Sequence, residues 1–191
     1  MTTGGGRRHG VTVMLRDETQ TRLLGEACGR VATPGLVIAL RGGVGVGKTT
    51  FVSGLSQGLG SPDRAKSPTF TLIEEHTGGR LPLYHIDLYR LGDDAGKELD
   101  LLDEYWFSEG VCAVEWAQLL EDALPDGRID LHLVETADSG DVLDTAVEGT
   151  KEARDGAGRR ELGGSGRTAI LSARGDAAVR TLQEWMTLWP C

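Results

Sequence analysis

"LVIALRGGVGVGKTTFVSGL", residues 36–55, is the most informative stretch of this chain. It opens with a continuous apolar run, "LVIAL", which is typical of a strand buried on both faces of a sheet. Gly42, Gly47, Lys48 and Thr49 follow and match the pattern G-x-x-x-x-G-K-[ST]. The residues after them have the character of a helix. A strand, a glycine-rich loop and a helix in this order predict a P-loop.

The chemistry of such a loop follows from its backbone. Glycines let the chain wrap closely and adopt positive φ, so that amide N–H groups point inward, and the helix dipole adds positive potential. Lys48 is expected to reach the β- and γ-phosphates of a nucleotide, and Thr49 to place its hydroxyl on Mg²⁺. The alternative is a glycine turn that binds nothing. The predicted phosphate-binding residues are Gly42, Gly43, Val44, Gly45, Val46, Gly47, Lys48 and Thr49.

Around the loop, strands and helices alternate. Strands are predicted at residues 11–15, 36–40, 69–76, 81–90, 110–116, 129–135 and 168–173, with a tight hairpin at "TGGR" and with 129–135 the more exposed strand. Helices are predicted at 17–32, 48–59, 98–107 and 176–189, the first with Asp17 or Thr19 as its N-cap. This pattern predicts an α/β fold, a P-loop NTPase-like three-layer sandwich with a mainly parallel central sheet and an antiparallel portion.

The length and composition predict one domain. The chain has 191 residues, of which 39% are hydrophobic and 26% charged. Residues 1–10 are rich in Gly and Arg and are expected to form a disordered tail, which leaves a single P-loop domain at 11–191. Residues 137–167 are charged, glycine-rich and without periodicity, so we expect a flexible insertion there.

The net charge and the cysteines indicate which kinds of partner this chain could bind and in which cell compartment it would work. The formal net charge of −9 disfavours direct binding to RNA or DNA, because such binding depends on Lys and Arg neutralising phosphates. No apolar run approaches the roughly 18 residues that cross a bilayer, and no secretory signal is visible, so no membrane partner is expected. Cys28, Cys112 and Cys191 lack metal-site spacing and suit small core positions in a reducing cytoplasm.

Two carboxylates complete the predicted site. Glu115 ends the buried run "VCAVE", at the sheet edge where doubly wound folds bind ligands, and is the predicted Mg²⁺ ligand beside Thr49. Asp87 ends "LYHID" and is expected to order metal-bound or attacking water. A surface carboxylate and a turn aspartate are the alternatives. For Trp116, core packing is weighed against stacking on a base, and for His85 a buried, satisfied histidine is expected.

The segment "KSPTFT" lies between the loop helix and the hairpin. A Ser or Thr at such a position can sense the γ-phosphate as a switch. Ser67, Thr69 and Thr71 are the candidates, with Thr69 preferred, and an ordinary proline turn is the alternative.

Five stretches together resemble one family. They are "GGVGVGKTTFVSGLSQGLG", "KSPTFTLIEE", "LPLYHIDLYRL", "LDEYWFSEGVCAVEWA" and the later "LP", and in this order and spacing they look like TsaE (also called YjeE), the bacterial P-loop ATPase of tRNA threonylcarbamoyladenosine (t6A) synthesis. The resemblance covers about residues 17–133, with a weaker match from Thr168 onward. It implies binding of ATP and Mg²⁺, slow hydrolysis alone, and docking on the TsaB–TsaD heterodimer to support repeated transfer of threonylcarbamoyl to tRNA by TsaD. Contact with tRNA would be indirect.

The resemblance also assigns residues. Lys48, Thr49 and Thr50 match the phosphate loop, and Lys48, Asp87 and Glu115 take the catalytic roles, with Thr49 and Glu115 on the metal. Glu18 or Thr19, Trp116, and Arg174 in the turn after the last strand are further candidates for nucleotide contact. One departure is Gly43, which stands where the family's loop usually carries aspartate.

Two other functions compete with a t6A ATPase. A small-molecule kinase would need an acceptor pocket and an arginine-bearing lid, for which "ARDGAGRR" is the only candidate. A nucleotide-dependent scaffold would bind ATP without needing Asp87 or Glu115 for its role. The ATPase is the function that we expect.

Overall fold

A seven-stranded sheet forms the centre of the computed structural model, which describes residues 8–62, 72–92, 99–106, 108–120, 123–136 and 166–189. The strand order is β1-β7-β6-β2-β5-β4-β3. Their bounds are β1 Arg8–Leu15, β2 Leu36–Arg41, β3 Ile73–His76, β4 Leu83–Asp87, β5 Val111–Glu115, β6 Arg128–Glu135 and β7 Arg167–Arg174. Strands β6, β2, β5 and β4 run parallel, and antiparallel pairs close both edges. The predicted α/β fold is confirmed.

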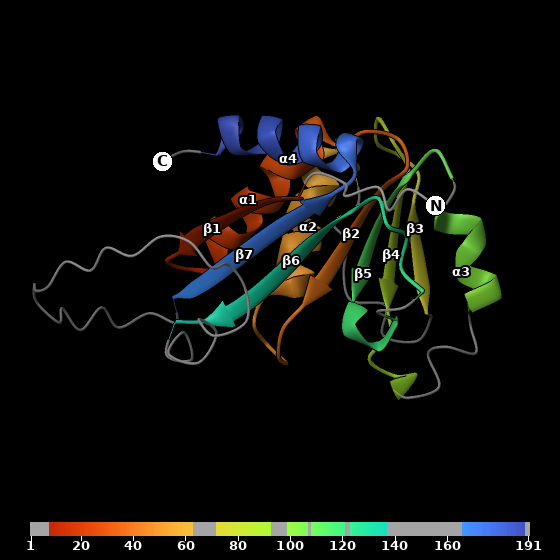
Figure 1. The fold of residues 1–191 in the computed structure, drawn as a ribbon, viewed down its shortest axis with the longest axis horizontal. Coiled ribbons are helices and arrows are strands. Elements are labelled where there is room, and N and C mark those ends of the chain that lie inside the picture. The colour runs from red at the N-terminus through yellow and green to blue at the C-terminus, as the bar shows by residue number, and fades with distance from the viewer. Residues whose placement is uncertain are drawn as a thin grey trace, which may run out of the picture.

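Helices cover the two faces of this sheet unequally (Figure 1). Helices α1 (Glu18–Val31), α2 (Lys48–Gly58) and α4 (Asp176–Leu188) share one hydrophobic core with one face. Helix α3 (Leu99–Trp106) and the short 3-10 helix η2 (Ala117–Leu120) pack on the other face, over β2, β5 and β4. None of the helices in the described ranges is long and apolar enough to cross a membrane.

Trp185 of α4 contacts both other helices in the larger core. Its ring is fully buried and lies 5.7 Å, between centroids, from the ring of Phe51 on α2. Its indole N–H donates to the backbone oxygen of Leu24 on α1 at 3.0 Å, so the three helices meet at this side chain. Cys28 and Cys112 are buried, as predicted, and Cys191 lies outside the described residues.

Helices α1 and α2 touch through glycines. A Cβ atom added at Gly25 would collide with the backbone oxygen of Phe51, and one added at Gly54 would collide with that of Arg22. The two backbones are therefore as close as they can be without side chains between them. This contact fixes the position of α2, and with it the loop that precedes α2.

The structure revises or resolves three expectations: where β1 begins, which residue caps α1, and how exposed β6 is. Strand β1 begins at Arg8, inside the predicted tail, because β7 pairs with it as far as Arg174. Asp17 is the N-cap of α1 and accepts a hydrogen bond from the Gln20 amide at 2.8 Å, whereas Thr19 lies within the helix. Strand β6 was expected to be exposed, but it is largely buried because β2 and β7 flank it.

We predict that Gly25→Ala lowers the free energy of unfolding by about 1–3 kcal/mol, because the backbone of α2 cannot move away from the added methyl. Helix propensity alone would raise the free energy of unfolding by about 1 kcal/mol, because alanine favours a helix more than glycine does. Urea denaturation of the full chain measures the change. Gly127→Ala is the control, since a Cβ there meets nothing within 4 Å. Equal stability of Gly25→Ala and the parent would contradict the close packing.

Candidate functional site

The glycine loop connects the end of β2 to the start of α2. Strand β2 lies between β5 and β6 and is parallel to both, so the loop leaves the sheet at the edge where these strands end. In β4 and β5, Asp87 pairs with Glu115, and Glu115 also pairs with Leu40 of β2. The two predicted carboxylates therefore reach the loop at the same level of the sheet.

The loop backbone needs glycine at three places. Gly42, Gly45 and Gly47 have φ of 132°, 76° and 108°, in the region that side chains disfavour. A Cβ at Gly42 would also collide with the backbone oxygen of Leu133. Gly47 is the N-cap of α2, and no side chain caps this end of the helix. The first amides of α2 are thus free of side-chain caps, as an anion site at a helix N-terminus requires.

Lys48 is held inside the loop. Its ammonium donates to the backbone oxygens of Gly42 and Gly43 at 2.9 and 2.7 Å, and lies 4.0 Å from the centroid of the Trp116 ring. Burial lowers the pKa of Lys48, and the carboxylates of Glu115 and Asp87 act in the opposite direction. These carboxylates favour the charged form of Lys48, the form that attracts phosphate.

Glu115 joins the loop helix to the sheet. The Thr49 hydroxyl donates to its Oε1 at 2.8 Å, and the Nε2 atom of His85 lies 2.9 Å from the same oxygen. Glu115 is 3% exposed and His85 is fully buried. A hydroxyl and a carboxylate at the start of a P-loop helix are the oxygen ligands that suit Mg²⁺, so the Thr49–Glu115 pair fits this ion.

A pocket of about 290 Å³ opens at this edge of the sheet. It contains most of the predicted site residues, together with Tyr89, for which the sequence offers no functional signal. The ring of Tyr89 lies 4.9 Å from that of Trp116, and Tyr89 is 58% exposed. The lining residues are Val44, Gly45, Gly47, Lys48, Thr49, Thr50, Asp87, Tyr89, Glu115 and Trp116.

Trp116 has an unusual backbone. Its φ of 60° is the only positive value among the non-glycine residues that the structure describes. A bulky residue in this conformation costs roughly 1–3 kcal/mol, and such strain is concentrated at functional sites. The indole lies against the Lys48 ammonium and lines the pocket, and it also packs against the smaller core, so both sequence-based expectations for Trp116 have a structural counterpart.

Some predicted residues are elsewhere. Arg174 lies at the end of the strands opposite to the glycine loop. Strand β7 is antiparallel to β6, so its last residue pairs with Arg128, the first residue of β6. The expectation of a nucleotide contact by Arg174 is therefore wrong. Glu18 and Thr19 are exposed at the start of α1 and do not line the pocket; Glu18 pairs with Arg22 at 2.8 Å.

Other predicted residues lie in the loop or outside the described chain. Gly42, Gly43 and Val46 belong to the loop without lining the pocket, and Val46 is buried in the core. Ser67, Thr69 and Thr71 lie outside the described residues, so their switch role stays a prediction.

The antiparallel direction of β7 brings a different arginine to the loop. Arg167, its first residue, is 8% exposed, and its guanidinium donates to the Thr21 hydroxyl at 3.4 Å. A Cβ added at Gly47 would collide with this guanidinium. The sequence predicts Arg167 as the last residue of the insertion, and only the pairing of β7 brings it to the site.

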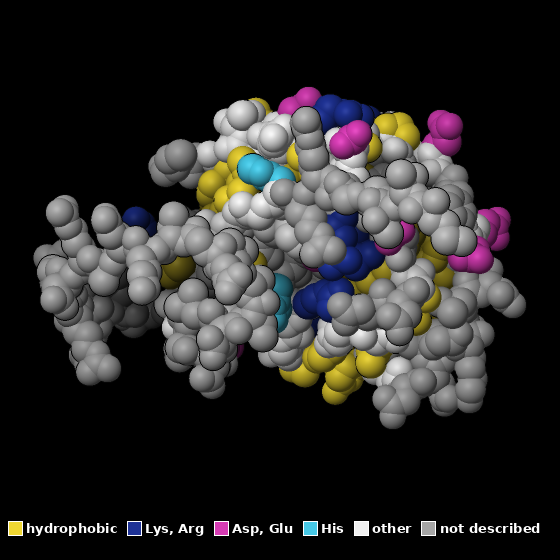
Figure 2. Space-filling model, in the orientation of Figure 1, with side chains coloured by type: hydrophobic (Ala, Val, Ile, Leu, Met, Phe, Trp, Pro, Cys, Tyr) yellow, Lys and Arg dark blue, Asp and Glu magenta, His cyan; other side chains and the backbone are white. Residues whose placement is uncertain are grey.

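A second charged group lies on the face of β2, β6 and β7 away from the larger core. The Asp130 carboxylate is buried and pairs with Arg128, Arg41 and Arg174 at 3.0, 3.3 and 3.4 Å. His132 shares this face, and burial together with the charge of Arg41 lowers its pKa. Figure 2 shows basic and histidine side chains on this face of the molecule. One carboxylate among three arginines makes the group locally positive in an acidic protein.

Comparisons with known proteins identify the family of this chain. The family model "Threonylcarbamoyl adenosine biosynthesis protein TsaE" matches residues 15–142. The tRNA threonylcarbamoyladenosine biosynthesis protein TsaE of Bacillus subtilis is 44% identical over 119 residues, 62% of this chain and 74% of that protein. The protein of the same name from Treponema pallidum is 38% identical over 128 residues, 64% and 90% of the two chains. A crystal structure of Bacillus subtilis YdiB is similar with a TM-score of 0.67 at 29% identity, covering 95% of this chain and 97% of the other. The chain therefore belongs to the TsaE family, as its motifs indicated.

Proposed function

We propose that this chain is the ATP-hydrolysing component of a cytoplasmic t6A synthesis machinery. It would bind Mg-ATP in the P-loop pocket and act on a TsaB–TsaD complex to support repeated turnover. The observation that carries the proposal is the hydrogen bond from Thr49 to Glu115 beneath a glycine loop that holds Lys48. The names of the relatives, tRNA threonylcarbamoyladenosine biosynthesis protein TsaE, support the process.

The proposed chemistry uses the pocket residues in distinct roles. Water attacks the γ-phosphate in line, and Lys48 and the loop amides stabilise the negative charge that develops there. Thr49 and Glu115 would hold Mg²⁺, which supplies further charge stabilisation when bound. Asp87 lines the same pocket and would order the attacking water or the water around the metal.

Partner binding replaces direct tRNA binding in this proposal. With a net charge of −9, the chain is poorly suited to hold tRNA alone. It can act on a protein complex that carries the tRNA, so docking on that complex becomes its main recognition task.

We predict that Gly47→Ala weakens Mg-ATP binding more than tenfold, because alanine strains a backbone at φ 108° and its methyl would displace Arg167. Titration calorimetry gives the affinity. Gly43→Ala is the matched control in the same loop, since its Cβ meets nothing within 4 Å and its φ is not positive. Comparable loss in both variants, or in neither, would contradict this account of the loop.

We predict that Glu115→Gln and Asp87→Asn still bind ATP but hydrolyse it about 10²-fold more slowly, because each loses a charge that positions water or metal. Single-turnover hydrolysis measures the rate, and Glu184→Gln, an exposed carboxylate on α4, is the control. If both variants lose hydrolysis yet sustain t6A turnover, the chain is a nucleotide-dependent scaffold.

The decisive test of the proposal adds the partners. We expect ATP turnover by the chain to rise when TsaB–TsaD, tRNA and threonylcarbamoyl-adenylate from the same host are present, and modified tRNA to accumulate over many cycles. Radiolabelled phosphate release and mass spectrometry of tRNA nucleosides report the two quantities. Unchanged hydrolysis and unchanged tRNA modification would refute the proposal, and a screen for phosphate transfer to small acceptors would then test the kinase alternative.

A further inference from the structure

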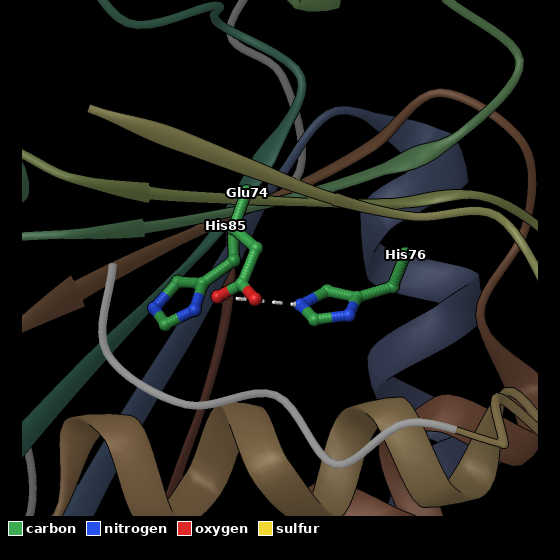
Figure 3. Close-up of side chains that lie close together, drawn as sticks. All are labelled: Glu74, His76 and His85. Carbon is green, nitrogen blue, oxygen red and sulfur yellow. Dashed lines mark ion pairs between the residues drawn. The ribbon is translucent and has the colours of Figure 1, made fainter. Parts of the chain in front are cut away.

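A second cluster of chemically active side chains lies between β3 and β4, outside the P-loop pocket. Glu74 and His85 are direct cross-strand partners, and His76 is two residues from Glu74, on the same face of β3. Figure 3 shows both imidazole rings directed toward the Glu74 carboxylate from either side. One donor atom from each residue lies within 4.8 Å of the other two, and His76 Nε2 is 3.8 Å from Glu74 Oε2.

Both histidines carry a buried nitrogen without a hydrogen-bond partner. His76 is 6% exposed and His85 is 0% exposed, and His76 Nε2 and His85 Nδ1 are both unpaired. The other nitrogen of His85, Nε2, is the one bonded to Glu115. Buried polar atoms are normally paired, so two orphan nitrogens facing one carboxylate call for a missing partner. A metal ion would satisfy both nitrogens, because it accepts electron pairs from two imidazoles and a carboxylate at once.

We propose that Glu74, His76 and His85 bind a divalent transition-metal ion of the zinc class. Imidazole nitrogen suits Zn²⁺ and its neighbours and does not suit Mg²⁺ or Ca²⁺. Around a tetrahedral Zn²⁺, bonded at roughly 2.1 Å, ligand atoms stand about 3.4 Å apart. The His76–Glu74 separation is 3.8 Å, and no two of the three donor atoms are more than 4.8 Å apart, so small side-chain rotations would bring them to this spacing. Three protein ligands leave a fourth position for water, and the side chain of Glu74, 40% exposed, gives access from solvent.

The site would also act on the P-loop pocket. With Nδ1 on the metal, the ring proton of His85 stays on Nε2, where it donates to Glu115. A carboxylate that accepts from a metal-bound histidine is a common arrangement, and it orients the ring and strengthens the ligand. His85 is thus a positioning residue for Glu115, and the metal ties the edge strand β3 to the strand that carries Asp87.

Zinc titration of the full chain tests the proposal without any nucleotide. The protein is prepared without a polyhistidine tag, stripped with chelator, and titrated with ZnCl₂ in millimolar Mg²⁺, which occupies hard oxygen sites. We expect one Zn²⁺ per chain, and at least about tenfold weaker binding in His76→Gln and in Glu74→Gln, because loss of supporting groups alone costs 10–100-fold. His132→Gln removes a histidine outside the cluster and should bind as the parent does.

Two further measurements separate a metal site from a purely structural cluster. Co²⁺ bound to the parent should give a visible absorption band that His76→Gln loses. Nitrogen-15 NMR of the zinc-loaded parent should show the His85 Nδ1 resonance shifted, with Nε2 still protonated. Absence of saturable zinc binding, equal binding by the parent and both cluster variants, or a metal shift at His85 Nε2 would each overturn the proposal.

Discussion

One carboxylate oxygen holds the site together. Glu115 Oε1 accepts from Thr49 at the start of α2 and lies within hydrogen-bond distance of His85 on β4, so it connects the loop helix, β5 and β4. A buried carboxylate is costly unless it is hydrogen-bonded, and here both contacts fall on one oxygen. Under the proposed function, the second oxygen would be the one that binds Mg²⁺. Moving α2 or β4 would remove one of these two contacts, and moving β5 would remove both, so the geometry of the sheet and that of the site depend on each other.

The parts of the site that depend on local sequence could be predicted. Strand, loop and helix are consecutive, and the loop's conformation follows from Gly42, Gly45 and Gly47, so the P-loop needs no knowledge of distant pairing. Asp87 and Glu115 could be predicted as well, because each ends a buried strand, and parallel strands bring their carboxyl ends to one edge. The structure places them opposite each other in register.

The parts that depend on strand direction could not be predicted. The sequence of the last strand is compatible with either a parallel or an antiparallel pairing with its neighbour. Its antiparallel pairing with β6 moves Arg174 away from the loop and brings Arg167 beneath Gly47. Tyr89 follows Asp87 by two residues, but its contact with the ring of Trp116, a residue with a left-handed backbone, is not evident from the sequence. The unpaired nitrogens of His85 and His76 depend on the β3–β4 register, which spacing alone does not give.

The charges that line the pocket explain why such a protein would work with partners. Among the described lining residues, Lys48 is the sole cation, and Asp87 and Glu115 are both carboxylates. Arg167 lies behind Gly47, is 8% exposed, and donates to Thr21, so it adds positive potential without reaching the pocket. Under the proposed function, the groups in the described part of the chain that would meet the charge developing on the γ-phosphate are Lys48 and the loop amides, together with Mg²⁺. An arginine supplied by a partner is worth about 10³–10⁵ in rate in related chemistry. Under the proposed function, a described lining with one cation and two carboxylates would favour slow hydrolysis in isolation and a rate that responds to docking.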